Sequence, residues 1–181
     1  MLDIAVHKQN LLNIFAKITK DSDKFGVWCC APLASNSGAL KFLASQINIQ
    51  ADELKIRIKN TLESIWAGQP NSEKFAYLIQ LDWDPDTLDS SNEDAAQRAT
   101  DLLATLGFLD AWRDRHDPSS LASCAEVLIN YIDYLESFDL LPSVRSTSVE
   151  KEMEAQKQFL LDLKNGKIRD DDVVKFHEWL F

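Results

Sequence analysis

Residues 95–112 read AAQRATDLLATLGFLDAW, and this stretch decides the fold class because its apolar residues recur every three or four positions. The stripe consists of Ala95, Ala99, Leu102, Leu103, Leu106, Leu109 and Trp112. Such spacing is typical of the buried face of an amphipathic α-helix. We predict that this helix begins near Ser91, with Asp94 three residues later completing a capping box.

The segments on either side carry the same pattern. The preceding stripe closes at Gly68 and Pro70, residues that commonly end helices. It consists of Leu54, Ile58, Leu62, Ile65 and Trp66. The following stripe comes after Asp117 and Pro118, which suit an N-cap and a first helical position. It consists of Leu121, Ala125, Leu128, Ile132 and Leu135.

Helical spacing also covers both ends of the chain. It occurs at residues 4–18, with an end near 21–23, at 149–163 and from about 171. Strand patterns are scarce. Residues 142–148 are the one predicted flexible connection. We therefore predict an all-α fold in which residues 1–181 form a single domain, an irregular bundle of about seven or eight helices.

Acidic residues dominate the charge of the chain. There are 29 Asp and Glu against 19 Lys and Arg, which gives a net charge of −10 and a pI near 4.7. Phosphate binding needs clustered Lys and Arg, so this balance argues against nucleic acid or an anionic membrane as the main partner. The charge is unevenly spread: residues 1–60 carry eight bases and five acids, a net +3, and the rest of the chain carries −13.

The sequence favours a reduced, cytoplasmic protein. Asp3 and His7 stand where a signal peptide needs a basic stretch and then an apolar one. No uncharged apolar run approaches the ~20 residues that span a bilayer. Three cysteines, of which Cys29 and Cys30 are adjacent, make a poor disulfide framework.

The densest acidic stretch, residues 82–94, holds six acids and no base. Its candidate partner-binding residues are Asp82, Trp83, Asp84, Asp86, Asp89, Glu93 and Asp94. Three interpretations stay open: a solvated connection that caps the next helix, an electronegative surface for a basic protein, and a calcium loop of the EF-hand kind. Thr87 departs from the calcium pattern because it stands where that loop needs Gly. Trp83 is either a contact residue of a binding surface or a side chain tucked under its own loop.

Patterns for catalysis or metal binding are weak elsewhere. The three histidines are isolated, and no Cys-x-x-Cys pair or Gly-rich phosphate loop occurs. Cys124 lies on an apolar stripe, and Cys29 and Cys30 lie in the apolar run 25–33, so all three are expected in the core. We expect no catalytic residue, no bound metal and no cofactor.

Residues 54–66, LKIRIKNTLESIW, resemble a helix of the YjaG-type bacterial family of unknown function, in which a similar helix ends in a Trp. The family continues with an acidic loop containing a Pro-Asp turn, like residues 84–87 here, and with a helix like residues 94–103. Residues 149–161 are similar to its late helix. The resemblance covers roughly residues 50–165, and both ends of the chain depart from the family. It implies an all-helical fold and assigns no activity and no functional residue.

The acidic loop favours a non-enzymatic binding protein. In its sharpest form, this is an immunity protein that neutralises a cognate basic bacterial toxin, such as a nuclease of a contact-dependent inhibition system, by occluding the active cleft. The alternative is a housekeeping or regulatory YjaG-like protein that acts through an unknown protein partner. A third alternative is an enzyme or metal protein that uses residues 82–93 or the cysteines.

Overall fold

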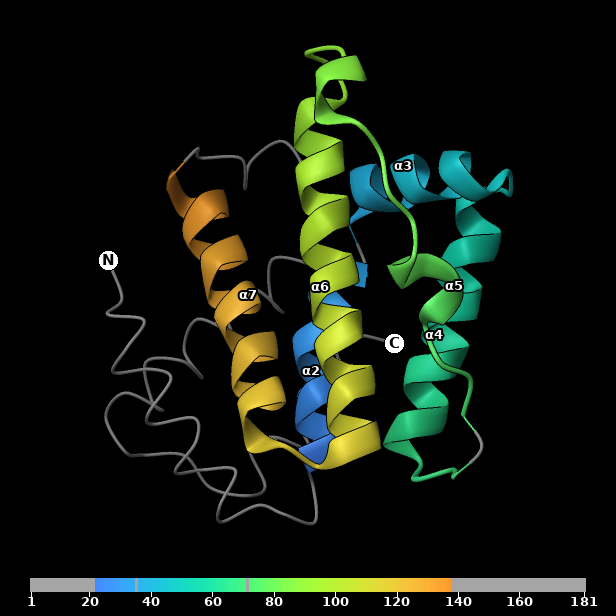
Figure 1. The fold of residues 1–181 in the computed structure, drawn as a ribbon, viewed down its shortest axis with the longest axis vertical. Helices are drawn as coiled ribbons and strands as arrows, with labels where there is room; N and C mark the ends of the chain where they lie inside the picture. The colour runs from blue at the N-terminus through green and yellow to red at the C-terminus, as the bar shows by residue number, and fades with distance from the viewer. Residues whose placement is uncertain (1–21, 35, 71, 138–181) are drawn as a thin grey trace.

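The computed structural model describes residues 22–34, 36–70 and 72–137, and every regular element in these ranges is helical (Figure 1). The elements are α2 (Ser22–Ala34), α3 (Ser37–Ile47), α4 (Ala51–Trp66), α5 (Ala76–Ile79), a 3-10 turn (Pro85–Thr87), α6 (Glu93–Arg115) and α7 (Pro118–Ser137). The predicted all-α fold is confirmed for these residues, which contain six α-helices. The prediction of seven or eight helices included segments at 4–18, 149–163 and beyond 171. Those segments and the predicted connection at 142–148 lie outside the described residues.

α6 is the longest described helix and packs against four of the other five. It contacts α7, α3, α2 and α5, and Figure 1 shows α7 alongside it with α2 behind. The predicted apolar stripe is its buried face, where Ala99, Leu102, Leu106 and Leu109 have no exposed surface. Burial of one Leu side chain contributes about 1.5–3 kcal/mol, so this face accounts for much of the packing energy of the bundle.

The start of α6 differs from the prediction. The helix begins at Glu93, and its N-cap is Asn92 rather than Ser91. The carboxylate of Asp89 accepts hydrogen bonds from the backbone N–H groups of Ser91 and Asn92, each at 3.1 Å. These bonds hold the two residues in a turn ahead of the helix, which is why the N-cap lies one residue later than expected.

α2 is buried on several sides. Its fully buried side chains are Phe25, Val27, Trp28, Cys29, Cys30 and Leu33. The helix contacts α4, α6 and α7, and Gly26 allows this close approach. A Cβ at Gly26 would lie 2.6 Å from Leu109 Cδ1 and 3.0 Å from Leu121 Cδ2. α2 begins at Ser22, in the stretch where the sequence predicted that a preceding helix ends, and that preceding helix lies outside the described residues.

The end of α4 lies where the sequence placed it. The helix stops at Trp66, and Gly68 then takes a left-handed backbone conformation with φ of 71°. The N–H of Gly68 donates to the carbonyl of Ile65 at 2.9 Å, and the N–H of Gln69 donates to the carbonyl of Ser64 at 3.1 Å. This pair of bonds is a Schellman motif, in which Gly is favoured because it has no Cβ to resist positive φ.

The predicted start of α7 is also confirmed. Pro118 is its first residue, and the Asp117 carboxylate accepts a hydrogen bond from the N–H of Ser119 at 3.0 Å. Only His116 and Asp117 separate α6 from α7, so the two helices form an antiparallel hairpin.

Residues 72–92 carry the chain from α4 to α6 and contain only α5 and the 3-10 turn. Phe75 and Leu78 are fully buried and fix the first half of this segment to the core. In Figure 1 the second half rises between α3 and α6 to the start of α6. The fold therefore places the acidic stretch at one end of the bundle. None of the described helices has the length and apolarity of a membrane-spanning segment.

Candidate functional site

The acidic stretch consists of the exposed connection between α5 and α6 and of the first two residues of α6, Glu93 and Asp94. Its six carboxylates are all on exposed residues, namely Asp82, Asp84, Asp86, Asp89, Glu93 and Asp94. No Lys or Arg occurs among residues 82–94. Because nothing within the stretch neutralises these charges, they generate a negative field at this end of the molecule.

Two of the six carboxylates shape the connection itself. Asp84 Oδ1 accepts a hydrogen bond from the N–H of Asp86 at 2.9 Å and so caps the 3-10 turn. Asp89 caps the turn before α6. Asp86 and Glu93 accept no hydrogen bond from the described residues that would give them a similar role. Their carboxylates are therefore the ones most available to another molecule.

Trp83 packs into the protein from within the acidic stretch. It is half-buried, and its ring meets Phe42 of α3 edge-on, with 4.9 Å between ring centroids and an interplanar angle of 76°. Leu81 and Leu88 are also half-buried and pack against the core. Of the two interpretations for Trp83, the structure thus supports a side chain anchored on the core, with one part of its surface left exposed.

The exposed part of Trp83 belongs to a groove of about 430 Å³. The groove lies between the acidic segment, the end of α5 and one face of α6. Its lining consists of Ile79, Leu81, Asp82, Trp83, Pro85, Thr100, Leu103 and Ala104. All but Asp82 and Thr100 are apolar. A carboxylate therefore stands in the wall of a hollow that is otherwise mostly hydrophobic.

α6 connects this groove to the acidic start of the helix. Glu93, Gln97, Thr100 and Ala104 are exposed and are spaced by four, three and four residues, so they lie on one face. Thr100 and Ala104 line the groove, and Glu93 lies two turns before Thr100 and three turns before Ala104. The structure thus brings Asp82, Trp83 and the Glu93 side of α6 to one surface.

Asp94 belongs to a different side of α6. Burial raises the pKa of the Tyr131 hydroxyl on α7, and the Asp94 carboxylate adds to that rise, which places it near α7. Asp101 lies on the same side, 3.4 Å from the guanidinium of Arg98, which is itself buried. Burial raises the pKa of Asp101, although Arg98 opposes the shift. Asp94 is exposed but does not line the groove.

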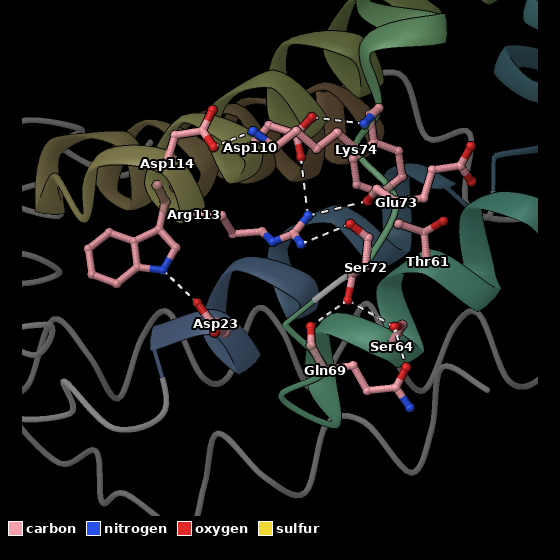
Figure 2. Close-up of polar contacts among 12 residues, drawn as sticks. Asp23, Thr61, Ser64, Gln69, Ser72, Glu73, Lys74, Asp110, Arg113 and Asp114 are labelled. Atoms are coloured by element: carbon pink, nitrogen blue, oxygen red, sulfur yellow. Dashed lines mark hydrogen bonds and ion pairs between the residues drawn. The ribbon is translucent and has the colours of Figure 1, made fainter.

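A polar cluster that the sequence did not point to fixes the chain between α4 and α5 (Figure 2). The buried Asp110 of α6 accepts a hydrogen bond from the N–H of Phe75 at 2.8 Å. Arg113, one turn later, lies 3.5 Å from Asp110 and donates to the carbonyls of Ser72 and Glu73, each at 3.3 Å. These contacts hold the segment from which α5 and the groove follow.

One signal in the sequence could have revealed this cluster. Asp110 lies four residues after Leu106 and hence on the apolar face of α6, where an acid needs a partner. Its partner, the backbone of Phe75, is 35 residues earlier and has no recognisable side-chain signature. The ion pair of Lys74 with Asp114 adds a second, exposed link between the same two segments.

The cysteines are core residues, as the sequence predicted. All three are free and buried, and the thiol of Cys124 donates to the carbonyl of Thr105 at 3.5 Å. Burial raises the pKa values of Cys29 and Cys30 well above the ordinary thiol value. Both therefore stay protonated at neutral pH, which is the unreactive form.

Among the described residues, neither His116 nor any group of carboxylates forms a metal-binding site. His116 ends α6 in a left-handed backbone conformation, with its ring edge-on to Trp112. Within residues 22–34, 36–70 and 72–137, no three His, Cys, Asp or Glu side chains are grouped so that they could hold a metal ion.

No protein-family model, curated protein or solved structure matched the chain. The resemblance to the YjaG-type family over residues 50–165 therefore stays a prediction.

Proposed function

We propose that the chain is a non-enzymatic, cytoplasmic binding protein, and specifically an immunity protein that neutralises a basic bacterial toxin. The observation that carries the proposal is the exposure of six carboxylates on one connection with no base among them. Such a surface suits a partner whose functional cleft is lined with Lys and Arg, as the active cleft of a nuclease is.

The shape of the connection supports binding by a preformed surface. The carboxylates of Asp84 and Asp89 accept hydrogen bonds from backbone N–H groups, and Trp83 packs against Phe42. The remaining acids are therefore presented from a held turn rather than from a loose chain. A partner that binds such a surface loses less conformational freedom on association, which favours affinity.

Electrostatics support a role in rapid capture of the partner. A field of one sign raises the rate of encounter with an oppositely charged protein, up to 10⁸–10⁹ M⁻¹s⁻¹ from an unassisted value of roughly 10⁵–10⁶ M⁻¹s⁻¹. Fast capture matters for an inhibitor that must reach a toxin before the toxin reaches its substrate. The same acids then occupy the positions where substrate phosphates would lie.

Co-expression of the chain with candidate basic toxin domains, in search of a product against which it protects cells, tests the proposal. Asp86→Lys combined with Glu93→Lys reverses two acids that have no capping role, and we expect it to abolish protection against that product. The control is Asp52→Lys combined with Glu53→Lys, which makes the same change in net charge at two exposed acids in the first turn of α4. The control variant should protect fully. Equal protection by both variants, each with the wild-type circular dichroism spectrum, would refute a role for the acidic connection.

A further inference from the structure

We propose that the groove beside Trp83 receives one large apolar side chain of the partner, from a segment in which Lys or Arg flanks that side chain. The inference rests on the proposed function and adds to it the chemistry of the contact. It treats the groove and the carboxylates as two parts of one recognition surface.

The groove is built on rigid parts of the fold. Leu103 in its lining is 8% exposed and belongs to the core, and Trp83 is held edge-on against Phe42. At the opposite wall, Ile79 of α5 is 38% exposed, so an apolar surface there is left in water. α5 itself is fixed by the buried residues Phe75 and Leu78. A hollow held in this way exists before any partner arrives.

The lining offers little to a polar ligand. The hydroxyl of Thr100 donates to the carbonyl of Ala96 at 2.9 Å, within α6. Asp82 Oδ1 accepts from the N–H of Trp83 at 3.0 Å, which leaves its other oxygen and its charge at the rim. The part of an occupant that lies inside the groove must therefore be apolar, and the part that lies at the rim beside Asp82 must be positively charged.

Charge complementarity identifies the occupant as part of a basic protein. Asp82 is in the lining, Asp84 and Asp86 flank the lining residue Pro85, and Glu93 continues the exposed face of α6. An apolar side chain without basic neighbours would gain nothing from these acids, and a second acidic copy of the chain would be repelled. The arrangement of apolar centre and charged rim is that of an interface hot spot.

The size of the groove fits a single anchor. Its volume of about 430 Å³ is toward the small end of the range, roughly 300–1,000 Å³, in which pockets hold a compact ligand. One large aliphatic or aromatic side chain, with its backbone crossing the opening, is an occupant of that scale. Hot-spot side chains of this kind commonly change affinity by tenfold or more when they are removed.

A selection from a random twelve-residue peptide library, displayed on phage and applied to the full chain, tests the inference. We expect enrichment of peptides in which a Leu, Met or Phe is flanked by Lys or Arg. One enriched peptide is then synthesised, and its affinity is measured by titration calorimetry. Replacing its apolar residue by Ser should weaken binding at least tenfold.

Two variants of the chain locate the binding. Ala104→Trp fills the groove from the exposed face of α6 and should weaken the peptide at least tenfold. Asn60→Trp places the same side chain on the exposed face of α4 and should leave affinity unchanged. Thr100→Trp, one turn from Ala104, repeats the test if Ala104→Trp lowers the thermal midpoint.

The outcomes separate this inference from the proposed function. If the enriched peptides are basic, show no preference for an apolar residue and bind Ala104→Trp as tightly as wild type, the proposed role of the groove is wrong. The proposed role of the acidic surface would still hold. Apolar peptides without Lys or Arg would overturn the basic occupant, and with it the proposed function. A wild-type dimer that Ala104→Trp converts to a monomer would mean that a second copy fills the groove, and the inference would be wrong. Enrichment of no motif would also overturn it.

Discussion

Asp110 links α6 to the backbone of Phe75 and so determines where α5 and the groove lie. It is 8% exposed and makes its hydrogen bond 35 residues away in sequence. A buried carboxylate that loses such a contact leaves a backbone N–H unsatisfied, at a cost of about 1–3 kcal/mol. At the scale of single residues, Asp110 is therefore one of the contacts that hold the site in place.

The stability of the chain should carry a pH signature from Asp110. Burial raises the pKa of this carboxyl above the ordinary value of 3.8, against the opposing effects of the Phe75 N–H and Arg113. The folded chain then keeps the proton to higher pH than the unfolded chain does. The contribution of Asp110 to the free energy of unfolding is therefore largest below 3.8 and falls as pH rises through the folded pKa.

Asp110→Asn removes that titration and provides the comparison. We expect wild type to lose stability relative to Asp110→Asn as pH rises from about 3.5 to about 6.5, measured by urea unfolding across this range. Other groups titrate in both proteins and cancel in the difference. A difference that is constant with pH, or that moves the other way, would mean that Arg113 and the Phe75 N–H outweigh burial.

Asp89 and Asp86 should differ in their effect on stability although both are exposed acids of the same connection. Asp89→Ala removes the acceptor for the N–H groups of Ser91 and Asn92 and should lower the free energy of unfolding by about 1 kcal/mol, as loss of a cap does. Asp86→Ala, which deletes the same charge without a cap, should change it by less than about 0.5 kcal/mol. Equal losses in urea unfolding would contradict the capping role.

The role of a single residue could be predicted from the sequence when it depends on that residue alone. It could not be predicted when it depends on a hydrogen-bond partner elsewhere in the fold. The exposure of the acids followed from their density, since six like charges cannot be buried together. Asp110 and the cap at Asp89 could not be found in the same way, because each depends on a backbone N–H whose position only the folded chain defines. The sequence likewise could not show that Asp94 lies toward α7 and Glu93 toward the groove, because this depends on how α7 packs against α6.

α2 and α6 each contain a glycine, and the space around the two glycines differs. Gly26 and Gly107 lie in the interiors of these two helices, and either one replaced by Ala gains up to about 1 kcal/mol of helix propensity. A Cβ at Gly107 would lie 3.8 Å from Ile79, an ordinary contact. A Cβ at Gly26 would lie 2.6 Å from the buried Leu109.

We expect substitution by Ala to have opposite effects on stability at Gly107 and at Gly26. Gly107→Ala should raise the free energy of unfolding by up to about 1 kcal/mol. Gly26→Ala should lower it, because overpacking of a filled core costs about 1–3 kcal/mol and exceeds the gain in propensity. Thermal and urea unfolding of both variants measure the effects. Stabilisation by Gly26→Ala would show that α2 can move away from α6 at little cost.

Three helices, α4, α6 and α7, were predicted from one apolar face, whereas α2, α3 and α5 were not predicted. α4, α6 and α7 alternate apolar and polar residues with a period near 3.6, and their ends carry Gly68, Asn92 and Asp117. α2 has a nearly continuous apolar run at 25–33, in which no face stands out. α5 has four residues, too few to show a period, and its place comes from Phe75 and Leu78 in the core.

The whole molecule is acidic in an uneven way, and this asymmetry was visible in the sequence. The groove was not, because Ile79, Trp83 and Ala104 form it only after α5, the acidic connection and α6 have packed together. The charge predicts a basic partner, and the fold adds a groove that we propose receives an apolar anchor of that partner. The acidic stretch and the groove lie at the same end of the bundle.

The most direct measurement is the association rate between the chain and a basic toxin domain against which it protects cells, followed by stopped-flow fluorescence as salt is raised. Screening has a length of about 10 Å at 0.1 M and about 3 Å at 1 M, so steering by the exposed carboxylates should fade over this range. We predict that the wild-type rate falls at least tenfold between about 0.01 and 0.5 M NaCl. Asp86→Lys with Glu93→Lys should be slower at low salt and should converge with wild type at high salt. A wild-type rate that does not depend on salt, or that equals the rate of this variant at low salt, would contradict the role of the acidic connection.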